Sequence, residues 1–231
     1  YLYFFFISII LISTINYVQY KFNFLIDSRE KHKIKLINKI PLSGGIIFLI
    51  YLLIVKILFN SFISINIILI LSLFFILGYF SDTRPNFKPI LRLIFQIILI
   101  ILMLHICDLK INKTNIFFID YFLSINNFNI IFTTFCILVF LNGSNFIDGV
   151  NTNLTLYNII ILTSLANYQF YFDLKLLLII LSTFCLFNFF GKCFLGDNGV
   201  YVISILTSFI VISMININYL NPFIALNLLW Y

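Results

Sequence analysis

Charged residues are scarce in this sequence. Asp, Glu, Lys and Arg make up 10% of its 231 residues, whereas a soluble domain has about 25%. Apolar residues make up 62% of the chain and gather in runs whose length suits the hydrocarbon of a bilayer. A soluble chain of this length would not hide so much apolar surface. The composition therefore excludes a soluble protein and predicts an all-α, polytopic integral membrane helical bundle.

Patterns of cysteine and histidine that bind metals are also missing. Cys107, Cys136, Cys185 and Cys193 have no close pairing, which predicts neither a disulfide framework nor a zinc site. His105 lies near the end of an apolar run and is expected to be an interfacial residue. The chain carries a net charge of +6, but its basic residues flank the apolar runs. This pattern indicates a membrane surface and no nucleic-acid partner.

The apolar runs predict about eight to nine spans in one transmembrane domain, residues 1–231, that is incomplete at both ends. The chain begins without Met and stops inside an apolar run. The expected spans are Leu2–Val18, Leu42–Phe59, Ile63–Phe80, Ile90–Ile106, Ile130–Leu141 (extended back toward Asn126), Leu154–Tyr168, Leu174–Phe190, Val200–Ile215 and the beginning of a span at Pro222–Tyr231.

Lysine and arginine set the orientation of these spans. Segment 19–40 holds six of the fourteen Lys and Arg residues, which by the positive-inside rule makes it cytoplasmic. Alternation of the spans then puts segments 81–89, 142–151 and 191–199 on the same side and segment 108–128 outside. With their flanks, the inside segments hold ten Lys and Arg residues against four outside. Every polar cluster discussed below is thus predicted to open at the cytoplasmic face.

The polar segment 142–151 has amides at Asn142 and Asn145 and a carboxylate at Asp148. Because these residues are three apart, a helical turn would put them on one face. Carboxylates near the bilayer are rare and commonly mark a functional site. The alternative is a solvated connector with a chance Asp.

A second cluster follows the span that ends at Phe80. Asp82 is followed by Lys88, Arg92 and Gln96 at spacings of four, so the two cations and the amide share a helical stripe. Cations that anchor a span at the interface would explain Lys88 and Arg92. They would not explain Asp82 and Gln96.

The third cluster is the glycine-rich segment 191–199, where Asp197 is the one acid. A carboxylate in such a loop suits Mg²⁺, which takes one or two protein carboxylates together with substrate phosphates and water. Asp82, Asp148 and Asp197, with cations on the same surface, favour phosphoryl transfer, in which positioning and charge neutralisation provide most of the catalysis.

The order of these motifs resembles that of the polyprenyl-phosphate N-acetylhexosamine-1-phosphate transferases (glycosyltransferase family 4). The matching residues are Asn142-x-x-Asn145-x-x-Asp148-Gly149 and Phe194-Leu195-Gly196-Asp197, preceded by the Asp82 segment. The resemblance covers nearly the whole chain. It implies that a sugar 1-phosphate is transferred from a UDP-sugar to undecaprenyl phosphate in the bilayer, with release of UMP. The site would face the cytoplasm at a bacterial inner membrane, use Mg²⁺ and begin a cell-envelope polysaccharide; a homodimer is left open.

The resemblance also implies roles for individual residues. Asp197 would bind the metal and Phe194 would stack on uracil. The nucleoside pocket would include Asn145, Phe146, Asp148 and Gly149, with Asn142 beside them.

The remaining roles concern catalysis and the lipid phosphate. Asp82, Asp148 and Lys39 are the catalytic candidates, and Lys39 with Gly44-Gly45 resembles the basic start of the second span. Asp82 would position undecaprenyl phosphate and, at lower pH, deprotonate it, whereas Asp148 belongs to the nucleotide pocket. The other substrate-binding candidates are Lys88, Arg92 and Lys192.

Departures from the family pattern leave alternatives open. Ser81 stands where the family often has a second Asp, and its His-rich loop is missing from this sequence, which favours a fragment or a non-catalytic relative. Asn151 replaces another Asp, which favours a surface-polysaccharide initiator that uses UDP-N-acetylglucosamine or a relative. A transporter would also carry charges among its spans. However, the acids here lie at one face, away from the midplane, and no inverted repeat is visible.

The charge distribution predicts the side of the membrane on which single positions lie. Ser28, Asp82, Asn145 and Asp197 are expected at the cytoplasmic side, and Asn115 outside. Single cysteines at these positions, in a chain whose native cysteines are replaced, would be labelled by an impermeant maleimide in intact cells only at position 115. Labelling of positions 82 and 197 from opposite sides would contradict a single active site.

Overall fold

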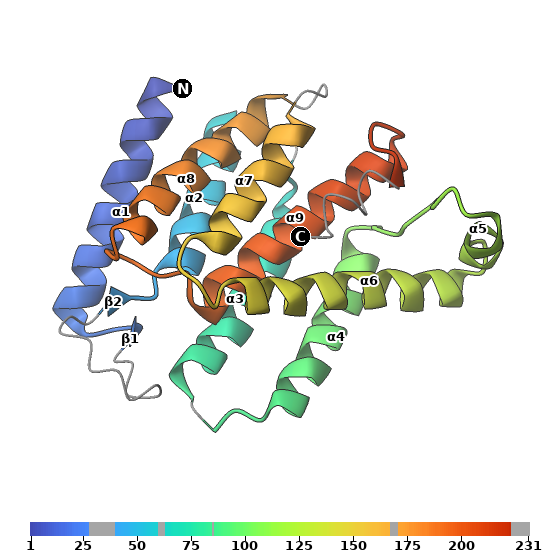
Figure 1. The fold of residues 1–231 in the computed structure, drawn as a ribbon, viewed down its shortest axis with the longest axis horizontal. Helices are drawn as coiled ribbons and strands as arrows, with labels where there is room; N and C mark the ends of the chain where they lie inside the picture. Colours follow the sequence, from blue (N-terminus) through green and yellow to red (C-terminus); the bar gives the residue numbers. More distant parts are fainter. Residues whose placement is uncertain (28–39, 60–62, 85, 167–170, 223–231) are drawn as a thin grey trace.

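The computed structural model describes residues 1–27, 40–59, 63–84, 86–166 and 171–222 (Figure 1). Lys39 lies outside these residues. The described elements are α1 (Leu2–Phe22), β1 (Ile26–Asp27), β2 (Ile40–Pro41), α2 (Gly44–Phe59), α3 (Ile65–Thr83), α4 (Pro89–Ile106), α5 (Phe117–Leu123), α6 (Asn126–Ile147), α7 (Asn153–Leu165), α8 (Tyr171–Phe189) and α9 (Gly196–Asn216).

The predicted fold class is confirmed. Helices α1, α3, α4, α6 and α9 are long and apolar enough to cross a membrane, and α2, α7 and residues 174–189 of α8 form shorter apolar helices. The segments expected as spans from Leu2 to Ile215 each correspond to one helix. Of the expected last span, residues 223–231 lie outside the described part of the chain.

Three boundaries differ from the sequence-based expectation. Helix α6 does not end at Leu141 but continues through the amide-rich motif to Ile147, where the Asn142 side chain donates to the Leu138 carbonyl one turn earlier in the same helix. Helix α9 begins at Gly196, which puts Asp197 in its first turn and not in a loop. Helix α5 interrupts the segment expected to be an outer loop.

Helix α9 is the centre of the bundle. Its side chains from Asn198 to Ser208 are all buried, as expected for a helix that is apolar all round. It packs against α2, α3, α6 and α7, while α1 packs against α8 on one side of the bundle and α4 against α3 and α6 on the other (Figure 1). Helices α1 and α4 expose many large apolar side chains, which suits contact with lipid.

The ends of α3 and α9 approach each other closely at Gly78. A Cβ atom at Gly78 would lie 2.6 Å from the backbone nitrogen of Asn198, where no side chain fits. The last turns of α3 are therefore held directly against the first turn of α9. This contact brings the Asp82 segment to Asp197, although the two are distant in the sequence.

Replacing Gly78 by Ala should destabilise the protein. The added methyl would push the backbones of α3 and α9 apart, and such overpacking costs about 1–3 kcal/mol. Gly143→Ala is the matched control, because a Cβ there meets nothing within 4 Å and Ala favours a helix by up to about 1 kcal/mol. Thermal unfolding in detergent should show a lower midpoint for Gly78→Ala alone; equal midpoints would contradict the close contact.

Candidate active site

The carboxylate of Asp82 caps the N-terminus of α9. Its Oδ1 accepts a hydrogen bond from the backbone N–H of Asp197 at 2.9 Å, and its Oδ2 accepts one from the backbone N–H of Asn198 at 3.1 Å. The first N–H groups of a helix have no partner within the helix and attract negative charge. Since α9 has no side-chain cap of its own, Asp82 supplies from α3 the acceptor that this helix lacks.

The Asn198 side chain joins three elements at the same point. Its Nδ2 donates to Asp82 Oδ2 at 2.6 Å and to the carbonyl of Leu42 at 3.4 Å, and its Oδ1 accepts from the Gly45 N–H at 2.9 Å. Asn198 is fully buried. Its amide therefore holds the start of α2, the end of α3 and the start of α9 together.

Asp197 lies beside this junction and remains partly accessible. Its Oδ2 accepts a hydrogen bond from the Ser81 hydroxyl and forms an ion pair with Arg92 Nη1 at 3.4 Å. The side chains of Asp197 and Arg92 are 26% and 28% exposed. Among the described residues, Asp197 Oδ1 has no hydrogen-bond partner. This oxygen can therefore reach a ligand without breaking an existing contact.

Asp148 completes the group of acids from the end of α6. It is the C-cap residue of that helix, and its carboxylate makes no hydrogen bond within the described part of the chain. Burial, together with the charges of Asp197 and Asp82, raises the pKa of Asp148 to about 7. The structure thus brings Asp82 and Asp197 into contact and puts Asp148 within electrostatic range of both.

Further polar groups line the same region. Asn142 Nδ2 donates to Gln96 Oε1 at 3.2 Å, which links α6 to α4. Gln96 Nε2, Ser144 Oγ and the Tyr201 hydroxyl are buried without a hydrogen-bond partner among the residues described. Tyr201 and Asn198 were missed in the sequence; the one available signal for Tyr201 was its position one turn after Asp197.

The other candidate residues from the sequence differ from these acids in their exposure and contacts. Phe194 is buried at 8% exposure, and its N–H donates to the Pro41 carbonyl at 2.8 Å, so its predicted stacking on uracil would require movement. Phe146 is 85% exposed. Lys88 and Gly149 are exposed, and Lys192 Nζ lies 5.7 Å from the centre of the Phe187 ring. Asn145 is half-buried with no hydrogen bond from its side chain within the described residues.

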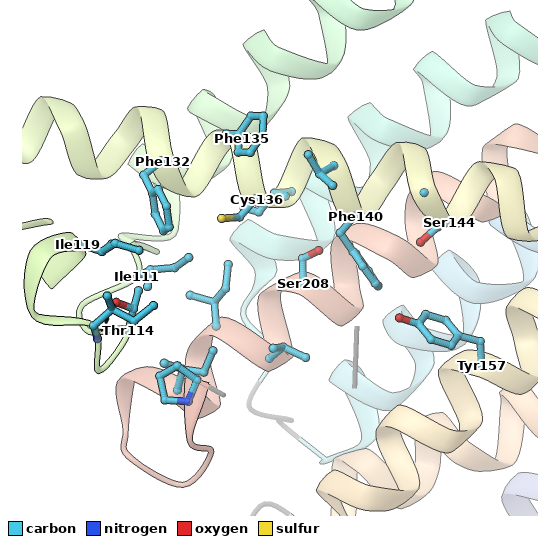
Figure 2. A pocket seen from close by; sticks show the side chains of 18 of the residues that line it. Ile111, Thr114, Ile119, Phe132, Phe135, Cys136, Phe140, Ser144, Tyr157 and Ser208 are labelled. Carbon is cyan, nitrogen blue, oxygen red and sulfur yellow. Dashed lines mark hydrogen bonds between the residues drawn. The ribbon is translucent and has the colours of Figure 1, made fainter. Parts of the chain in front are cut away.

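An apolar groove of about 720 Å³, drawn in Figure 2, has Ile147, the residue before Asp148, in its lining. At one end it is lined by Gly143, Ser144 and Ile147 of α6, and at the other by Ile111 and Thr114. Figure 2 shows Phe132, Cys136 and Phe140 of α6 along one side and Ser208 of α9 opposite. The lining residues of α6 run from Phe132 to Ile147, about 22 Å of helix, which is most of the thickness of a bilayer.

The acids can be compared with the requirements of a metal ion. No group of three or more His, Cys, Asp or Glu side chains that would hold a metal occurs among the described residues. A fully protein-coordinated site of the zinc type is therefore not formed by them. Mg²⁺ needs only one or two carboxylates when phosphates and water complete its coordination, and Asp197, with Oδ1 unpartnered among the described residues, is one carboxylate of that kind.

A family model described as glycosyl transferase family 4 matches residues 64–215. This range includes Asp82, Arg92, Asp148 and Asp197. No curated protein and no solved structure matches the chain.

Removing the charge of Asp148 should change how stability depends on pH. Its pKa is raised from 3.8 in the unfolded chain to about 7 in the fold, so ionisation destabilises the folded protein increasingly as pH rises from about 4 to about 7. Asp148→Asn should therefore raise the unfolding midpoint more at pH 8 than at pH 5 in metal-free buffer. A difference between variant and parent that does not change with pH would contradict this environment for Asp148.

Proposed function

Because the chain belongs to glycosyl transferase family 4, we propose that it transfers a sugar 1-phosphate from a UDP-sugar to undecaprenyl phosphate and releases UMP. The observation that carries this proposal is that two unlike features share α6: its end carries Asp148, one of a group of carboxylates with Arg92 nearby, and a long apolar groove is lined by the helix from Ile147 back to Phe132. A phosphate on an apolar chain is a substrate that requires both.

The groove supports a lipid acceptor in particular. Its lining is almost entirely apolar and follows α6 from Ile147 back to Phe132. A UDP-sugar has no apolar chain to fill such a space, whereas a polyprenyl chain does. With the chain in the groove, the phosphate would lie near Ser144 and Asp148, within reach of the side chains at the start of α9. The donor's pyrophosphate would approach the same centre from the solvent.

The residues present fit a bound Mg²⁺. Asp197 offers one carboxylate oxygen that has no partner among the described residues, and Asp148 offers a carboxylate whose ionisation is disfavoured by burial and by the neighbouring acids. When bound, Mg²⁺ would neutralise charge on the pyrophosphate during transfer. Arg92 would then be available to hold a phosphate oxygen, since its guanidinium already lies 3.4 Å from Asp197.

The division of roles between Asp82 and Asp148 follows from their contacts. Asp82 accepts three hydrogen bonds, which uses most of the roughly four acceptor positions of a carboxylate. We assign Asp82 to holding the first turn of α9, in place of the proton transfer expected from the sequence. A phosphate monoester with a second pKa near 6 needs little help to lose its proton at neutral pH.

The finer identity of the substrates follows the resemblance in the sequence. UDP-N-acetylglucosamine or a related UDP-sugar is the proposed donor, and the product would begin a cell-envelope polysaccharide at the cytoplasmic face of a bacterial inner membrane. The excess of Lys and Arg in the inside segments supports this orientation. A homodimer is also proposed, and the mass of the protein in detergent would test it.

Asp197→Asn should abolish most of the transfer activity. The change removes the charge proposed to hold Mg²⁺ but keeps the side chain's shape, and a lost electrostatic stabiliser typically costs about 10²–10³ in turnover. The assay follows UMP release from a panel of UDP-sugars with undecaprenyl phosphate and varied Mg²⁺. Asp108→Asn, at an exposed Asp beyond the opposite end of α4, is the matched control and should retain the parent rate.

Two outcomes would count against the proposal. An unchanged rate and unchanged Mg²⁺ dependence in Asp197→Asn would remove Asp197 from the metal site. Failure of the parent protein to release UMP with any donor in the panel would favour the non-catalytic relative. Release of UMP only when a lipid phosphate is present would support the transfer reaction over hydrolysis of the donor.

A further inference from the structure

Asn198 uses both ends of its amide inside the protein. The side chain is 0% exposed, its oxygen accepts from Gly45, and its nitrogen donates to Asp82 and to the Leu42 carbonyl. Because a buried amide is costly unless it is hydrogen-bonded, these contacts fix its orientation. The oxygen and nitrogen of the amide cannot exchange places. The nitrogen would then face the Gly45 N–H, donor against donor, and the oxygen would face the Asp82 carboxylate, acceptor against acceptor.

The contact with Gly45 fixes α2 relative to the other two helices. Gly45 lies in the first turn of α2, where the backbone N–H has no partner within the helix. The Asn198 oxygen provides that partner at 2.9 Å. An acceptor on α9 therefore completes the start of α2, and the two helix starts are tied together at one residue.

The contact with Asp82 connects this junction to the proposed metal ligand. Asp82 accepts from the backbone of Asp197 and of Asn198 as well as from the Asn198 side chain. The neighbouring Ser81 donates to the Asp197 carboxylate. The position of the end of α3 thus sets both the backbone and the carboxylate of Asp197, and Asn198 sets the position of Asp82.

We propose that Asn198 is a positioning residue, which orients Asp197 for a divalent cation by holding Asp82 and the start of α2 against the first turn of α9. This inference rests on the proposed function in assigning the cation to Asp197. It goes further in giving a role to a residue that touches neither the cation nor the substrates. The cation site would depend on a clamp that joins α2, α3 and α9.

The chain offers a matched control in Asn158. This residue is also 0% exposed, and it also connects its helix, α7, to α9, because its Oδ1 accepts from Thr207 Oγ1 at 2.6 Å. Its Nδ2 donates to the Leu154 carbonyl at 2.9 Å. Asn158→Ala removes a buried amide from the bundle interior without touching the acids, so it measures the general cost of such a loss.

The test is a titration of Mn²⁺, followed by the EPR signal of free Mn²⁺, with the full chain in detergent. Asn198→Ala should weaken Mn²⁺ binding about 10–100-fold, as is typical when a residue that orients a metal ligand is removed. Asn158→Ala should lower the thermal midpoint by a similar amount and leave Mn²⁺ affinity unchanged. Asp82→Asn should also weaken Mn²⁺ binding. The double variant that combines it with Asn198→Ala should bind Mn²⁺ no more weakly than the single variant with the lower affinity, since both changes disrupt the same clamp.

Several results would overturn the inference. These are parent-like Mn²⁺ affinity in Asn198→Ala, an equal loss of affinity in Asn158→Ala, additive losses in the double variant, and absence of Mn²⁺ binding by the parent. Where Asn198→Ala does not fold, Asp82→Asn, which preserves side-chain shape, carries the test, and parent-like affinity in it overturns the clamp. A parent protein that binds Mn²⁺ through this clamp but transfers no sugar phosphate would refute the proposed function and leave the inference standing.

Discussion

The cap that Asp82 provides for α9 is the interaction on which the arrangement of the site depends. Helix α9 is buried from Asn198 to Ser208, so its leading N–H groups would lack partners if no acceptor were brought to them. The acceptor comes from α3, and the close contact at Gly78 makes the approach possible. Once α3 is fixed in this way, Ser81 meets Asp197, and Arg92 at the start of α4 follows because α4 packs on α3.

The polar and apolar parts of the site meet because helices α6 and α9 each contribute to both. Helix α9 contributes Asp197 in its first turn and Ser208 three turns later, the second of which lines the groove with α6. Helix α6 contributes the groove along its length and Asp148 at its end. Two helices packed side by side therefore present carboxylates at one end and an apolar channel along the rest. A phosphate at the end of an apolar chain matches this gradient of polarity.

The sequence predicted the spans well because hydropathy depends on composition within each segment, as for Ile90–Ile106 in α4. The prediction was less accurate at the ends of the helices, where local contacts that hydropathy does not report determine the structure. The amide-rich motif extends α6 to Ile147, with the Asn142 side chain bonded to the Leu138 carbonyl and to Gln96 of α4. The roles of Asp82 and Asn198 were beyond prediction, because their partners are 115 and 153 residues away along the chain for the Asp197 and Gly45 contacts. In the sequence, Asn198 has the appearance of a loop residue between an acid and a glycine.

The balance of charge at the site favours a cation. Asp82, Asp148 and Asp197 interact electrostatically, and within the described residues the one ion pair to any of them is that of Arg92 with Asp197. Three carboxylates and one guanidinium leave an excess of negative charge, which adds to the effect of burial in raising the pKa of Asp148. A phosphate would be repelled by such a site. A divalent cation removes the excess, so binding of the cation and of a pyrophosphate should each strengthen the other.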